Sequence, residues 1–199
     1  MKQERLIEKF DRQADKYERR RRKETKNHWR RKIFTSARGK TLEAAVGAGM
    51  NFAFLPADID YTGVDFSREM LKRAEAAAGN YPFTSQFILS DVEALQVPED
   101  SFDTIISSGT LCAYPEPGII LNLFQQWCRP EGQVLLMEHG LFDSASLAFL
   151  QKIVDPVAHS WLGCHQDRNI LELVSNSKLK IVRQEKGFHG ALNLIWAKP

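Results

Sequence analysis

The sequence predicts a doubly wound α/β protein with a mostly parallel, seven-stranded sheet and an N-terminal helical arm. Three observations predict this class. Short apolar segments of strand length alternate with helical periodicity from residue 40 onward. No Pro- or Gly-rich linker divides the 199 residues, a length that suits one compact core. Residues 1–39 are different, being basic and helical in spacing, so we expect an arm over 1–39 and a domain over 40–199.

The arm is expected to hold two helices. Apolar side chains at Phe10, Ala14 and Tyr17 recur at spacings of four and three, which predicts an amphipathic helix over residues 3–18. A basic run follows, and a second helical stretch is expected to end near Gly39.

The domain is expected to alternate strands and helices. The expected strands cover residues 41–46, 59–65, 85–90, 102–108, 133–138, 179–185 and 191–197. The expected helices cover residues 67–79, 117–129, 144–160 and 167–177. This alternation is typical of a parallel sheet with helices on both faces. The last two strands lie close together in the sequence and could form an antiparallel pair at an edge.

Charge is distributed unevenly along the chain. Residues 1–40 carry 16 Lys and Arg against 6 Asp and Glu, a formal charge of +10. The remaining 159 residues carry 11 against 19, a charge of −8. A basic arm of this kind favours an anionic partner, such as a membrane surface contacted by residues 1–34. The alternatives are a solvated helix face and docking of the arm onto the acidic domain.

Composition excludes several classes of protein. Hydrophobic residues make up 43% of the chain, but no apolar run reaches the ~18 residues that span a bilayer. The opening residues hold no apolar stretch typical of a secretory signal. Three cysteines, widely spaced, predict neither a disulfide framework nor a metal site. We therefore expect a cytoplasmic protein, which could also bind peripherally to the inner face of a membrane.

Ligands of open α/β sheets bind outside the carboxyl ends of the strands. The corresponding loops here cover residues 43–52, 65–70, 90–94, 107–114 and 138–143. The first loop contains Glu43, whose carboxylate could hold a cation, and small residues at Ala45, Gly47 and Gly49. Small residues permit a sharp turn and close approach of a ligand. Asp65 ends the second strand, where an acid can accept hydrogen bonds from both hydroxyls of a ribose.

Two other nucleotide motifs do not fit this loop. A nicotinamide-nucleotide fingerprint needs a third small residue, and Phe52 stands at that position. A phosphate-binding P-loop needs Gly-Lys-Ser/Thr, which does not follow. A glycine-rich loop can also be a purely structural turn.

Four motifs in order resemble the class I S-adenosylmethionine-dependent methyltransferases. They are Glu43-x-Ala-x-Gly47-x-Gly, Gly63-Val-Asp-Phe-Ser, Ser90-Asp-Val-Glu-Ala-Leu and Phe102-Asp-Thr-Ile-Ile-Ser. The resemblance covers residues 40–140 closely, and the order and spacing of the motifs are specific to the family. Ala45 departs from the pattern, because the family usually has glycine there.

The resemblance implies a role for each matched residue toward S-adenosylmethionine. The backbone of residues 45–49 would contact the amino acid and ribose, and Asp65 would bind the ribose hydroxyls. Phe66 and Met70 would flank the adenine, or are ordinary core residues. The remaining implied contacts are the adenine amino group with Asp91, the adenine ring with the Val92 amide, and the methionine end with the carbonyls of Ser107 and Ser108.

The acceptor side is less well defined. Methyl transfer needs a positioned nucleophile, and a thiol or phenol also needs a base. The candidates are His139, at the ligand-binding edge after the fifth strand, and His165, although a lone histidine is more often structural. Residues 10–17 resemble the opening segment of quinone C-methyltransferases, which implies that Tyr17 belongs to a lid; alternatively it only anchors a helix.

The C-terminal third resembles thiol S-methyltransferases and, in part, bacterial phospholipid N-methyltransferases. The motifs include Met137-Glu-His, Trp161 and Gly163-Cys-His. The resemblance implies an acceptor pocket within residues 139–168. Apolar side chains there suit a lipophilic acceptor or are core residues; they are Phe142, Leu147, Phe149, Leu150 and Trp161.

We therefore expect an S-adenosylmethionine-dependent methyltransferase of a small, lipophilic or lipid acceptor, methylated at sulfur, nitrogen or carbon. A phospholipid N-methyltransferase is one alternative. Nucleic-acid methylation is disfavoured, because no Asn/Asp-Pro-Pro-aromatic motif follows the fourth strand. A cofactor-binding module without catalysis is the third alternative, since fold alone does not determine function.

Overall fold

The computed structural model describes residues 3–199, except for the side chains of Gln3 and of residues 158–162. Its seven strands form one sheet in the order β3-β2-β1-β4-β5-β7-β6. The strands are β1 (Lys40–Ala44), β2 (Asp60–Asp65), β3 (Thr84–Leu89), β4 (Phe102–Ser108), β5 (Cys128–His139), β6 (Lys180–Gly187) and β7 (Leu192–Lys198). All neighbours pair in parallel except β7, which is antiparallel to β5 and β6. The predicted fold class is confirmed, including the antiparallel edge pair.

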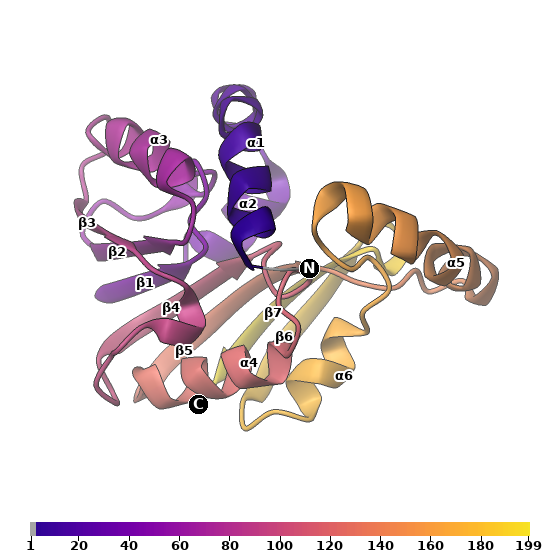
Figure 1. The fold of residues 1–199 in the computed structure, drawn as a ribbon. Coiled ribbons are helices and arrows are strands. Elements are labelled where there is room, and N and C mark those ends of the chain that lie inside the picture. The colour runs from indigo at the N-terminus through magenta and orange to yellow at the C-terminus, as the bar shows by residue number, and fades with distance from the viewer. Residues whose placement is uncertain (1–2) are drawn as a thin grey trace.

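The helices are α1 (Gln3–Lys23), α2 (His28–Phe34), α3 (Arg68–Ala78), α4 (Pro117–Trp127), α5 (Ala145–Leu162) and α6 (Ile170–Ser175). Three short 3-10 turns complete the fold: η1 (Phe52–Phe54), η2 (Val92–Ala94) and η3 (Phe188–Gly190). In Figure 1, α1, α2 and α3 lie above the sheet, whereas α4 and α6 lie below it. Helix α5 projects beyond the sheet, on the side of β6 and β7. Within the described residues, no helix combines the length and apolarity needed to cross a bilayer.

The core has a layer on each face of the sheet. Successive side chains of a strand point to opposite faces, so Ile105 of β4 packs toward α4 and α6 while Ile106 packs toward α2. Both side chains are fully buried. A third cluster, built around Phe52 and Tyr61, fills the space beneath α3. These layers hold the ends of β1, β2 and β4 rigidly at one edge of the sheet.

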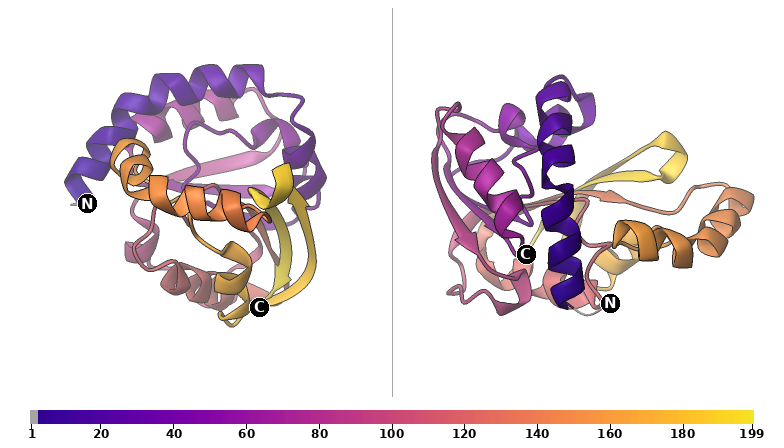
Figure 2. Two further views of the ribbon diagram at one scale, coloured as in Figure 1. Left: turned by 90° about the vertical axis from the view of Figure 1, so that its right-hand side faces the viewer. Right: turned by 45° about the horizontal axis from the view of Figure 1, so that its top comes forward.

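Helix α1 lies side by side with α3, as the left view of Figure 2 shows. Its apolar face packs on the domain, where Ala14 is fully buried against Ala48 and Met70. The apolar face of α1 is therefore packed against the domain, with Phe10 and Tyr17 partly buried beside Ala14.

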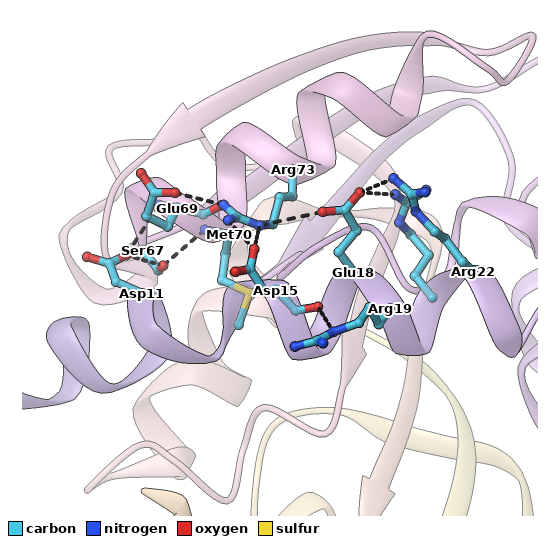
Figure 3. Close-up of polar contacts among 10 residues, drawn as sticks. Asp11, Asp15, Glu18, Arg19, Arg22, Ser67, Glu69, Met70 and Arg73 are labelled. Atoms are coloured by element: carbon cyan, nitrogen blue, oxygen red, sulfur yellow. Dashed lines mark hydrogen bonds and ion pairs between the residues drawn. The ribbon is translucent and has the colours of Figure 1, made fainter.

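Hydrogen bonds and ion pairs connect α1 to α3 (Figure 3). Asp11 accepts hydrogen bonds from the Ser67 hydroxyl and the Glu69 amide, at the start of α3. Arg73 of α3 pairs with Asp15 at 2.5 Å and with Glu18 at 3.7 Å. The arm is thus docked through its own acidic residues, and most of its Lys and Arg residues remain exposed.

Candidate functional site

A first cleft lies where the carboxyl ends of β1, β2 and β4 face α1. It contains about 490 Å³ of empty space, which includes some open solvent. Its walls are Phe10, Tyr17, Ala45, Gly47, Asp65, Phe66, Met70, Ser108, Gly109, Thr110, Ala113 and Tyr114. Seven of the residues singled out from the sequence therefore meet here: Tyr17, Ala45, Gly47, Asp65, Phe66, Met70 and Ser108.

The floor of the first cleft is the bend after β1. Ala45, Gly47 and Gly49 all adopt left-handed backbone conformations, with φ of 52°, 56° and 80°. A Cβ atom on Gly47 would point into open space, with the Tyr17 ring 4.0 Å away as its nearest neighbour. A Cβ atom on Gly49 would instead lie 2.4 Å from the Phe52 ring. The missing side chain of Gly47 therefore leaves space in the cleft, whereas the missing side chain of Gly49 leaves space for the buried Phe52 ring.

Asp65 presents a buried carboxylate to the first cleft. Oδ2 accepts a hydrogen bond from the Gly47 amide and Oδ1 accepts one from the Ser67 amide, both at 2.8 Å. Burial raises the pKa of Asp65 to about 6, although these two amides oppose the shift. Each oxygen keeps a further lone pair, so the carboxylate can accept two more hydrogen bonds.

Apolar side chains form the opposite walls of the first cleft. Phe10 of α1 packs edge-on against Phe66, with ring centroids 5.5 Å apart. Met70, the third residue of α3, is buried beside them. This wall suits the flat, apolar faces of a purine ring.

Five residues expected to bind the cofactor do not line the first cleft: Glu43, Gly49, Asp91, Val92 and Ser107. Glu43 is buried in β1, where its carboxylate accepts hydrogen bonds from Asn51 and Tyr61 at 2.8 and 2.7 Å. Burial raises its pKa to about 7. Gly49 lies against the Phe52 ring, Val92 packs in the core, and the Ser107 hydroxyl donates to Glu138.

Asp91 begins the turn η2 and accepts a hydrogen bond from the Glu93 amide. It is not part of the cleft wall, but its charge contributes to raising the pKa of Asp65. The two carboxyl groups that we expected to contact the ribose and the adenine thus lie near each other.

Glu138 organises the loop after β4. It accepts hydrogen bonds from the Ser107 hydroxyl at 2.7 Å and from the amides of Thr110 and Leu111 at 2.9 and 3.3 Å. Burial raises the pKa of Glu138 to about 7. This loop, which contributes Ser108, Gly109 and Thr110 to the first cleft, is therefore fixed to the end of β5.

A second cleft opens beside the first, at the ends of β4 and β5. It is lined by Tyr17, Arg20, Glu24, Asn27, Trp29, Arg30, Ser108, Gly109, Met137, His139, Phe188, Ala191 and Leu192. Tyr17, Ser108 and Gly109 belong to both clefts, so the two spaces meet at these residues.

The two candidate histidines lie in different places. His139 lines the second cleft, where burial, followed by the charges of Arg20 and Arg30, lowers its pKa. Its imidazole is therefore neutral at pH 7 and can accept a proton. His165 lines neither cleft. Its Nδ1 instead contacts the Asp155 carboxylate of α5 at 2.8 Å.

Several residues of the two clefts were not singled out by the sequence. Thr110, Ala113 and Tyr114 lie in the loop 107–114, which its place after a strand had marked as a ligand loop. Trp29 and Arg30 come from the arm and Phe188 from the β6–β7 hairpin, far from any motif. Only the tertiary packing brings this second set together.

The apolar residues expected in an acceptor pocket on α5 are largely exposed. Leu147, Phe149 and Leu150 are 44%, 67% and 55% exposed, and they line neither cleft. The Trp161 side chain lies outside the described residues. These α5 side chains therefore do not form the expected pocket, and the second cleft is formed largely by the arm and the C-terminal hairpin.

The first cleft fits an adenosyl cofactor. It offers a buried carboxylate for ribose hydroxyls, apolar walls for a purine, and space at Gly47 that any side chain would fill. Chain comparisons agree: residues 42–136 match the methyltransferase domain family. Fold, cleft and matched domain define a class I S-adenosylmethionine-dependent methyltransferase. S-adenosylmethionine is its cofactor.

Two curated proteins illustrate the relatives of this chain. It is 29% identical over 157 residues to phosphatidylethanolamine N-methyltransferase of Cereibacter sphaeroides, covering 77% of this chain and 76% of that one. It is 29% identical over 150 residues to thiol S-methyltransferase TMT1A of Homo sapiens, covering 70% of this chain and 61% of the relative.

Solved structures share the fold at low identity. One S-adenosylmethionine-dependent methyltransferase, from Mesorhizobium loti, matches with a TM-score of 0.58 and 19% identity over 80% of this chain and 90% of that chain. Another, from Aquifex aeolicus, matches with a TM-score of 0.59 and 12% identity over 79% and 80%.

Proposed function

We propose that this enzyme methylates a small, lipophilic acceptor that occupies the second cleft. The observation that carries the proposal is the junction of the two clefts at Tyr17, Ser108 and Gly109. A cofactor in the first cleft and an acceptor in the second would meet there. The named relatives act on a phospholipid and on thiols, which supports an acceptor of this class.

Bound S-adenosylmethionine supplies an electrophilic methyl group to the junction. Asp65 would hold the ribose hydroxyls of this cofactor, and Phe66 and Met70 would pack on its adenine. Tyr17 closes the space above Gly47 and restricts entry of water, which favours a displacement reaction. His139, with its Nε2 near Gly109, accepts the proton that the acceptor releases.

Cofactor binding tests the first half of this proposal. The Asp65→Ala variant should bind S-adenosylhomocysteine about 10- to 100-fold more weakly in isothermal titration, because two hydrogen bonds to a charged group are lost. Asp60→Ala is the matched control, since Asp60 is an exposed carboxylate at the other end of the same strand. Equal affinities of the unchanged protein and both variants would show that Asp65 does not bind the cofactor.

The acceptor is tested by S-adenosylhomocysteine production with a panel of thiols, amines, phenols and phosphatidylethanolamine dispersed in detergent. We expect turnover with lipophilic members and none with their short polar analogues. Turnover with no member of the panel, despite tight cofactor binding, would favour a cofactor-binding module without catalysis.

We also propose that the enzyme contacts a membrane through α5 and not through the apolar face of α1. Phe149, Ile153 and Val157 are 67%, 58% and 61% exposed on this helix, an apolar surface that soluble monomers rarely leave open. The charged residues of α5 are Lys152 and Asp155, and Asp155 is buried. An apolar helix surface free of exposed acidic groups suits insertion into the interfacial region of an anionic bilayer.

The position of α5 relative to the second cleft supports this proposal. The loop before α5 contacts the β6–β7 hairpin, where the Asp143 amide donates to the His189 carbonyl at 2.8 Å. Phe188 of the same hairpin lines the second cleft and is 65% exposed. A bilayer that held α5 would therefore lie close to the mouth of the second cleft.

Sedimentation with phosphatidylglycerol–phosphatidylcholine vesicles tests the membrane contact. The Phe149→Glu/Ile153→Glu variant should lose most vesicle binding, whereas Val182→Glu, on an equally exposed valine of β6, should retain it. Equal binding by both variants would place the contact elsewhere, and no binding by the unchanged protein would refute it.

A further inference from the structure

Arg30 is a cation buried beside the second cleft. Its side chain comes from α2, which begins after Asn27 and directs Arg30 toward the end of β4. Only 9% of its surface is exposed. A guanidinium cannot lose its proton in a protein, and removing its charge from water is costly unless an anion compensates it.

No internal anion compensates Arg30 directly. Nη1 donates to two neutral oxygens, Oδ1 of Asn51 and Oγ of Ser108, the latter at 3.0 Å. Nε is buried and has no hydrogen-bond partner among the described residues. Across the same part of the chain, no carboxylate lies within 4.0 Å of this guanidinium. Glu43 reaches it only through Asn51.

Arg20, the other arginine of the second cleft, has an ion-pair partner. It pairs with Glu24 at 2.5 Å. Arg30 therefore supplies the positive charge of the cleft wall that has no ion-pair partner in the described structure. Asn51 and Ser108 hold the guanidinium in one orientation, so little side-chain entropy remains to be lost when a ligand binds.

We propose that Arg30 binds an oxyanion, a carboxylate or a phosphate, at the junction of the two clefts. Ser108, its partner, lines both clefts, so the anion can belong to either ligand. One source is the α-carboxylate of the cofactor, and the other is a phosphate on the acceptor. This inference rests on the proposed function, because it assigns the two clefts to a cofactor and an acceptor.

Isothermal titration with three probes distinguishes the sources. S-adenosylhomocysteine carries the α-carboxylate, 5′-methylthioadenosine carries the same nucleoside thioether without it, and phosphoethanolamine carries only the phosphate. The test variants are Arg30→Met, which removes the charge, and Arg30→Lys, which keeps it and loses the planar fork. Arg31→Met is the matched control, because Arg31 is exposed on the same helix and stacks over Phe54.

If the cofactor carboxylate binds Arg30, the Arg30→Met variant should bind S-adenosylhomocysteine about 10- to 100-fold more weakly and 5′-methylthioadenosine equally well. If the acceptor phosphate binds, both adenosyl probes should be unaffected and phosphoethanolamine binding should be lost. Arg30→Lys should show an intermediate loss in either case, which preserves the test if Arg30→Met does not fold.

Two outcomes would overturn the proposal. Unchanged affinity for all three probes in a folded Arg30→Met or Arg30→Lys variant would show that Arg30 is only structural. A parallel loss for S-adenosylhomocysteine and 5′-methylthioadenosine would show that the residue shapes the cleft without contacting an anion. Failure of the unchanged protein to bind either adenosyl probe would instead contradict the proposed function itself.

Discussion

The first and second clefts share three residues but are built in different ways. Residues at or just after the ends of β1, β2 and β4 form most of the first cleft, and several of them belong to the sequence motifs. Side chains from α1, α2 and the β6–β7 hairpin form most of the second cleft. The difference suggests that the cofactor position is determined by strand order, whereas acceptor choice depends on the arm and the C-terminal hairpin.

The largest effect that separates the two clefts is expected at His139. The His139→Gln variant should lower kcat/KM about 100-fold if its ring accepts a proton, because general bases contribute at least this much. S-adenosylhomocysteine affinity should not change, since His139 lines only the second cleft. The measurement is a pH–rate profile together with isothermal titration. His189→Gln, on a histidine outside both clefts, is the control.

The next effect distinguishes Gly47 and Gly49, the two glycines of the bend after β1. Both have positive φ, so replacement by alanine costs ~1–2 kcal/mol of unfolding free energy at either site. Gly49→Ala should cost a further ~1–3 kcal/mol, because its Cβ would overlap the Phe52 ring, which is fully buried. Urea unfolding measures this difference.

Cofactor affinity should show the opposite order for these glycines. The Gly47→Ala methyl group would enter the cleft, so its S-adenosylhomocysteine affinity should fall more than that of a folded Gly49→Ala variant. An equal loss of stability in the two variants would contradict the assignment of Gly49 to core packing.

A smaller effect follows from the raised pKa of Asp65. Its carboxyl must be ionised to accept two hydroxyl donors, so cofactor affinity should fall about tenfold per pH unit below about pH 6. Folding should respond in the opposite direction. The folded-state pKa lies above the ordinary value of 3.8, so the contribution of Asp65 to stability is complete below pH 3.8 and is lost as the pH rises through 6.

Isothermal titration between pH 5 and 8 checks this prediction. The Asp65→Asn variant should bind more weakly than the unchanged protein at pH 8 and show no such pH dependence. A pH dependence that persisted in Asp65→Asn would point to another group, such as Glu43 or Glu138, whose pKa values are both about 7.

The fold could be predicted from the sequence because every strand and helix of the domain carries its own periodicity. The boundaries were less certain. Helix α1 continues to Lys23, five residues beyond the predicted end, where apolar periodicity stops. Pairs such as Arg22 with Glu18 and Arg20 with Glu24 stabilise this last turn, and charge spacing alone signals them weakly.

The candidate site could be predicted only in part. Strand ends placed Asp65 and Ser108 correctly at one edge, because this follows from topology. The sequence could not distinguish Gly47 from Gly49, since the difference lies in where the Phe52 ring packs. Likewise, α5 has the composition of a core helix, and only the structure shows that its apolar residues lie outside the core.

The smallest predicted effect concerns Ala45, where the resemblance leads us to expect glycine. Ala45 has φ of 52°, a conformation that is strained for a residue with a Cβ atom. Ala45→Gly removes this strain but makes the unfolded chain more flexible, so we expect a net gain of only ~0.5–1 kcal/mol in unfolding free energy. Cofactor affinity should stay within about twofold, because Asp65 and Gly47 keep their positions. A large gain in affinity would instead show that the Ala45 methyl group narrows the first cleft, and that this enzyme holds its cofactor loosely through that one side chain.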